Sequence, residues 1–157
     1  MFKDKQTPGC DYGPNNEDED GDELIRFEIN SSTGYRLEIR LLESIKDSRT
    51  KSTVLKCKQW SPLHGDKSWT RAVGAGYVDY LLRNLAEARI PAIPEYVAGL
   101  DGTDYELMLN QGFNITTYRW WGNAPKGYEP IAAFTNELLK LARCNERVSI
   151  DMADTQN

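Results

Sequence analysis

The chain reads LIRFEINSSTGYRLEIRL from Leu24 to Leu41. In each half of this stretch apolar residues alternate with charged ones, and Ser31–Gly34 between the halves consists of turn-forming residues. Because successive side chains of a strand point to opposite faces, the alternation predicts two strands, each with an apolar and a charged face. The glycine-containing connection joins them as an antiparallel hairpin, with one face packed and the other in solvent.

The rest of the chain extends this pattern. Further strands are predicted at 53–60, 105–109 and 115–121, where apolar, β-branched or aromatic residues alternate with polar ones. Apolar residues spaced by three or four predict a helix at 68–89 with Ser68 as its N-cap, and a closing helix that begins near Pro130. The order βββ-α-ββ-α predicts an α+β fold: a single, mainly antiparallel sheet of about five strands with two helices packed on one face.

Composition divides the 157 residues into one domain and two flanks. Residues 1–23 are rich in proline, glycine, asparagine and acidic residues and have few large apolar ones, which is typical of a disordered arm. The segment 144–157 has a similar character and is expected to be a flexible tail. Residues 24–143 remain as a single α+β domain, long enough to bury one hydrophobic core.

Charge and cysteine content narrow the classes of function. With 19 basic and 24 acidic residues the net charge is −5, which argues against a general nucleic-acid binder. No apolar stretch is long enough to span a membrane, and the first residues lack the apolar core of a signal peptide. Three cysteines without CxxC spacing argue against a disulfide scaffold, so a cytoplasmic location is expected.

Residues 35–60 are basic within this acidic protein, with 7 basic and 3 acidic side chains and a net charge of +4. On antiparallel strands the outward face would carry four of these cations, Arg36, Arg40, Lys56 and Lys58. This face is a candidate surface for an anionic partner or for the acidic arm of the protein itself. The alternative is an ordinary solvated face, because outward strand positions are polar in most proteins.

The segment Tyr118-Arg-Trp-Trp121 is the most distinctive one in the chain. Strand alternation places Tyr118 and Trp120 on the core side, and Arg119 and Trp121 on the other. Arginine and tryptophan are favoured in binding hot spots, so Arg119 and Trp121 join the candidate interaction surface. The alternative is that both tryptophans pack in the interior.

The remaining reactive side chains match no established catalytic or metal-binding pattern. They are His64 with Ser61 and Asp66, the cysteines Cys10, Cys57 and Cys144, the acidic run Asn16–Gly21, and the carboxylates Asp101, Asp104 and Glu106. The histidine set lies in one short loop, the cysteines lack the close pairing of zinc ligands, and the acidic run lacks the final glutamate of a calcium loop. The three carboxylates are typical of a turn. No catalytic residue, metal site or cofactor is therefore predicted.

Together these features favour a non-catalytic protein-interaction module. By analogy at the level of fold and composition, it would be an immunity-type or regulatory inhibitor of a basic protein partner. One alternative is a small-molecule or carbohydrate-binding domain that uses exposed tryptophans as stacking platforms. A second alternative is a hydrolase built on the Asp101–Glu106 cluster. Neither a membrane nor a nucleic acid is expected as a partner, and the sequence indicates no particular oligomeric state.

Overall fold

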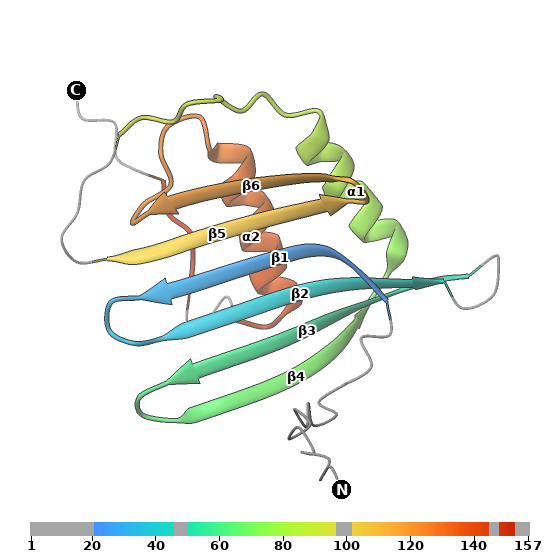
Figure 1. Ribbon diagram of the computed structural model, residues 1–157, viewed down its shortest axis with the longest axis horizontal. Helices are drawn as coiled ribbons and strands as arrows, with labels where there is room; N and C mark the ends of the chain where they lie inside the picture. Colours follow the sequence, from blue (N-terminus) through green and yellow to red (C-terminus); the bar gives the residue numbers. More distant parts are fainter. Residues whose placement is uncertain (1–20, 46–49, 97–101, 145–147, 153–157) are drawn as a thin grey trace, which may run out of the picture.

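A computed structural model describes residues 21–45, 50–96, 102–144 and 148–152. In these residues six antiparallel strands form one sheet, and two helices lie together behind it (Figure 1). In chain order the elements are β1 (Asp22–Ser31), β2 (Arg36–Ile45), β3 (Lys51–Ser61), β4 (Gly65–Val73), α1 (Ala75–Ala86), β5 (Thr103–Gln111), β6 (Asn114–Trp121) and α2 (Glu129–Leu141). The strand order in the sheet is β4-β3-β2-β1-β5-β6. The structure confirms an α+β fold with a single antiparallel sheet, and it has one strand more than the five predicted.

The hairpin predicted from Leu24 to Leu41 is present as β1 and β2. Phe27 lies opposite Ile39, and Ile29 lies opposite Leu37, with all four side chains buried. The turn closes with a hydrogen bond from the Ser31 amide to the Tyr35 carbonyl. Gly34 has a φ of 90°, a conformation that favours glycine. The pairing therefore follows from the alternation and the turn together.

The helix predicted at 68–89 is wrong in its first part. Residues 65–73 form β4 and pair along their whole length with β3, and α1 begins at Ala75. The N-cap is Gly74 rather than Ser68. Trp69 alternates onto the core side, where its Nε1 donates a hydrogen bond to the Ala142 carbonyl at 3.0 Å. Pairing with an existing strand and burial of this indole explain why the segment extends the sheet.

The core lies between the sheet and the two helices. An aromatic group at its centre comes from three neighbouring strands, with Phe27 stacked on Tyr105 and on Trp120. The buried residues Phe134 and Leu138 of α2 belong to the same cluster. The helices therefore cover one face of the sheet only, and the charged face of the hairpin points away from them.

Of the predicted flexible tail at 144–157, the structure describes Cys144 and residues 148–152, and these pack on the domain. Cys144 and Ile150 are buried in the core cluster. The side chain of Asn136 on α2 accepts a hydrogen bond from the Ile150 amide at 2.9 Å and donates one to the Ile150 carbonyl at 3.0 Å. These two bonds and an apolar side chain attach 148–152 to the domain. The predicted arm at 1–23 falls mostly on residues 1–20, outside the described residues, and β1 already begins at Asp22.

Candidate functional site: the open face of the sheet

The face of the sheet that points away from the helices carries charged rows that run across the strands. We call this surface the open face. In its central row Glu38 of β2 lies opposite Glu28 of β1, and Glu28 lies opposite Glu106 of β5. In the same row Lys58 of β3 and Arg119 of β6 flank the three glutamates on either side. We call the three central glutamates the carboxylate row.

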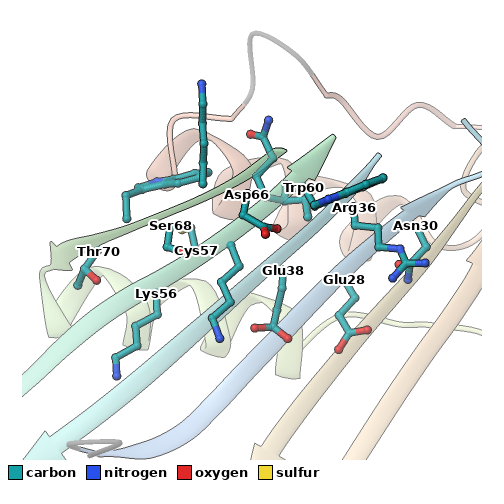
Figure 2. Close-up of a pocket in the computed structure, with 15 residues that line it drawn as sticks. Glu28, Asn30, Arg36, Glu38, Lys56, Cys57, Trp60, Asp66, Ser68 and Thr70 are labelled. Carbon is teal, nitrogen blue, oxygen red and sulfur yellow. The ribbon is translucent and has the colours of Figure 1, made fainter. Parts of the chain in front are cut away.

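Like charges on directly opposite positions disfavour each other, so the carboxylate row is an unfavourable arrangement in the isolated sheet. Burial raises the pKa of the Glu28 carboxyl, and the charges of Glu38 and Glu106 raise it further. Arg26 opposes this effect, because its Nη1 lies 4.0 Å from Oε1 of Glu28. Figure 2 shows Glu28 and Glu38 projecting side by side from neighbouring strands, with Lys56 on the next strand.

The adjacent row is basic and consists of Lys56 on β3, Arg40 on β2 and Arg26 on β1. Glu23 lies between two of these cations. Its Oε1 is 2.9 Å from Nε of Arg26, and its Oε2 pairs with Nε of Arg40. One carboxylate thus bridges two guanidinium groups and holds the two arginines beside the carboxylate row.

A hollow of about 870 Å³ lies on this surface over β2, β3 and β4. Glu28, Glu38, Arg36 and Lys56 line it together with Trp60, whose side chain is 40% exposed. Figure 2 shows the Trp60 ring at one end of the hollow, beside Arg36. The hollow therefore offers charges of both signs and one aromatic ring.

The predicted residues Arg119 and Trp121 lie on the same open face at the β6 edge. Nε of Arg119 is 2.8 Å from Oε2 of Glu106, and its Nη2 is 3.6 Å from Oδ2 of Asp104. Trp121 is half-buried, and its indole rests on Gly102: a methyl group there would come within 2.7 Å of the indole nitrogen. Trp120 points the other way and is 6% exposed.

All six predicted surface residues share one face, but in two separate groups. Arg36, Arg40, Lys56 and Lys58 lie on β2 and β3, whereas Arg119 and Trp121 lie on β6. The carboxylate row, which the sequence analysis missed, lies between the groups. One signal was present, because Glu28 and Glu38 are equally distant from the centre of the turn. Glu106 could not be found in this way, since β5 joins the sheet from a remote part of the chain.

The other reactive side chains form no common site. His64 is exposed in the turn after β3, and its ring makes no hydrogen bond with another described residue. Asp66 lies on the open face, opposite Trp60. Cys57 and Cys144 are both buried, and burial raises the pKa of the Cys57 thiol to about 12. Cys10 and Asp101 lie outside the described residues.

Within the described ranges no three histidine, cysteine, aspartate or glutamate side chains are placed to hold a metal ion. Neither helix there has the length and apolar character needed to cross a membrane. Comparisons of the chain with protein-family models, with curated proteins and with solved structures gave no match.

Proposed function

We propose that this protein is a non-catalytic interaction module that binds a basic segment of a partner protein through the open face. The observation that carries the proposal is the carboxylate row. Three glutamates occupy adjacent cross-strand positions, with Cβ atoms about 5 Å apart by the geometry of antiparallel pairs. A lysine or arginine side chain of a partner, placed among them, would replace repulsion with charge-assisted hydrogen bonds.

The electrostatic environment supports a cationic ligand group. Glu38 makes no ion pair with another described residue, and Glu28 has only the contact of 4.0 Å with Arg26. Both carboxylates are partly buried, so their charges are less well solvated than those of freely exposed side chains. A partner that brings a positive charge here gains more than it would at an ordinary exposed glutamate.

The dimensions of the face favour a protein over a small ligand. Trp60 and Trp121 belong to one row across the sheet, which also contains Arg36, Asn30 and Asp104. Four strand spacings separate the two tryptophans, so they are about 19 Å apart. Two aromatic side chains at this separation, with charged residues between them, match the aromatic anchors and polar surroundings of protein interfaces.

An immunity-type or regulatory inhibitor remains the class of activity that we propose, because an acidic row suits neutralisation of a basic partner. The hollow beside Trp60 favours a second candidate, a carbohydrate or other small-molecule site, since its volume of about 870 Å³ falls in the usual range for ligands. Seven of its fifteen lining residues are charged, however, whereas such sites are mostly apolar with few polar groups. The hydrolase alternative is weaker, because Asp104 and Glu106 are both engaged by the exposed Arg119.

The test compares two charge-matched double variants. Glu28→Gln with Glu38→Gln removes two charges from the carboxylate row, and Glu87→Gln with Glu95→Gln removes two exposed charges elsewhere. Binding is measured by titration against arrays of lysine- and arginine-rich peptides and against proteins captured by the natural sequence. We expect at least a tenfold loss for the first variant and little change for the second, since charged interface contacts are worth about 2 kcal/mol or more. Equal losses for both variants would indicate only a net-charge effect and would contradict the proposal.

A further inference from the structure

The two edges of the sheet differ in how well they are protected against pairing with another strand. The edge strand β4 carries the exposed charges Asp66 and Lys67 and the half-buried Arg71. The other edge, β6, carries a single charge, Arg119, which is already paired with Glu106. Natural proteins use charges to prevent edge-to-edge association, so β4 is protected and β6 is not.

The backbone of β6 has a definite set of groups that point away from the sheet. In antiparallel pairs, alternate residues exchange hydrogen bonds with the neighbouring strand. The Gly122 amide donates to the Thr103 carbonyl at 2.8 Å, which assigns the even-numbered residues of β6 to the β5 side. The amides and carbonyls of the odd-numbered residues Ile115, Thr117 and Arg119 therefore point outward. None of them makes a backbone hydrogen bond elsewhere in the described part of the chain.

The side chains at this edge are exposed and largely uncharged. Ile115 is 62% exposed, and Phe113 at the tip of the β5–β6 turn is fully exposed. Thr116 points toward the helix side and is exposed as well, so the helices leave this end of the strand uncovered. An exposed apolar edge with free backbone groups is the kind of strand that adds to another strand.

We propose that two copies of this chain associate by antiparallel pairing of their β6 strands about a two-fold axis at Thr117. In this register Thr117 lies opposite Thr117 of the other copy, and Ile115 lies opposite Arg119. The three outward-pointing residues of each copy then meet each other, and every opposed pair exchanges two hydrogen bonds.

A second copy fits this edge because the strand is complementary to itself. The two-fold register keeps the two Arg119 charges apart, and it places the aliphatic part of each arginine against an isoleucine. The association would join the two open faces into one continuous surface. It does not depend on the proposed function, because none of its contacts involves the carboxylate row.

The test uses the same substitution at the two opposite edges. Thr117 and Thr70 stand at the two ends of the row that contains Lys56, Arg40 and Arg26, and the pairing of β3 with β4 directs the Thr70 amide outward as well. Thr117→Pro removes the central outward amide of β6, whereas Thr70→Pro makes the same change on β4. Proline is tolerated on an edge strand where the amide faces solvent. Sedimentation velocity gives the mass of each protein over a range of concentrations.

We expect a dimer for the natural sequence and for Thr70→Pro, and a monomer for Thr117→Pro. If circular dichroism shows that Thr117→Pro does not fold, Thr117→Lys takes its place, because a lysine protects an edge without removing an amide. Amide hydrogen exchange gives a second readout: the outward amides of Ile115 and Arg119 should be protected in the dimer and should lose protection in the variant. A monomeric natural sequence, a dimeric Thr117 variant, or loss of the dimer in Thr70→Pro alone would overturn the proposal.

Discussion

Replacement of Glu28 by glutamine should stabilise the protein at neutral pH. Glutamine keeps the shape of the side chain and one acceptor oxygen but removes the central charge of the carboxylate row. Two like-charge cross-strand contacts, with Glu38 and Glu106, are relieved, and one contact of 4.0 Å with Arg26 is lost. Each of these interactions is worth about 0.2–1 kcal/mol, and solvent screening keeps them near the low end. One contact is gained on balance, and the variant also avoids the desolvation of a partly buried charge, so the expected net gain is about 0.5 kcal/mol.

The gain should depend on pH in a defined direction. The pKa of Glu28 is raised above 4.5 in the folded state, so the folded protein binds this proton more tightly than the unfolded chain. Stability linked to Glu28 is therefore present at low pH and is lost as the pH rises through the folded pKa. The glutamine variant has no such loss. Its advantage should be small near pH 4 and should increase as the pH rises toward neutrality.

Thermal or urea unfolding of both proteins between pH 4 and 7 measures this difference. For a chain of 157 residues, 0.5 kcal/mol corresponds to a shift in Tm of roughly 1–2 °C. Glu87→Gln is the control, because it removes an exposed glutamate on the opposite side of the sheet and should change stability little at any pH. A Glu28→Gln variant that is less stable at pH 7, or whose advantage does not change with pH, would refute the account of the carboxylate row.

Three further predictions concern the interior and can be checked by unfolding and labelling experiments. Trp120→Ala should lower the free energy of unfolding by about 3–5 kcal/mol in urea unfolding, as large-to-small core substitutions do. Trp121→Ala should lower it clearly less, because Trp121 is only half-buried, and the reverse order would contradict the register of β6. Asn136→Ala should lower the free energy of unfolding by about 1–3 kcal/mol and increase hydrogen exchange at the Ile150 amide, since two hydrogen bonds with Ile150 are lost. Unchanged exchange would contradict the attachment of 148–152. Cys57, whose raised pKa keeps the thiol protonated, should resist alkylation at pH 8 until the protein is unfolded, and rapid labelling of the native protein would contradict its burial.

Alternation of apolar and polar residues, together with the β-branched and aromatic content of 115–121, predicts every strand except β4. The sequence predicts a helix over most of that strand because Val73, Tyr77, Leu81 and Leu85 continue a spacing of four residues across the boundary at Gly74. The four-residue spacing of α1 thus continues toward the N-terminus into residues whose structure depends on pairing with β3. Only tertiary structure decides such a segment, because the hydrogen bonds to β3 and the contact of the Trp69 indole with Ala142 are not local.

The candidate site was predictable in part for the same reason. Alternation assigns each side chain to a face, and it correctly placed Arg119 and Lys58 on the face away from the core. It gives no information on which strands are neighbours. The carboxylate row exists because β1 lies between β2 and β5, and this order depends on how the second half of the chain joins the sheet.

The position of this row bears on the proposed function. Elsewhere on the open face Arg26 and Arg40 also lie opposite each other, but the carboxylate of Glu23 bridges them, and Arg119 is paired with Glu106. Glu28 and Glu38 depart from this arrangement at the centre of the surface, where two glutamates face each other although one lysine in either position would form a pair. A sequence that is consistent at most levels tends to depart from consistency where function requires it. We therefore infer that the row is kept for a cationic group supplied from outside the chain, and the stability gained by Glu28→Gln should be accompanied by a loss of partner binding.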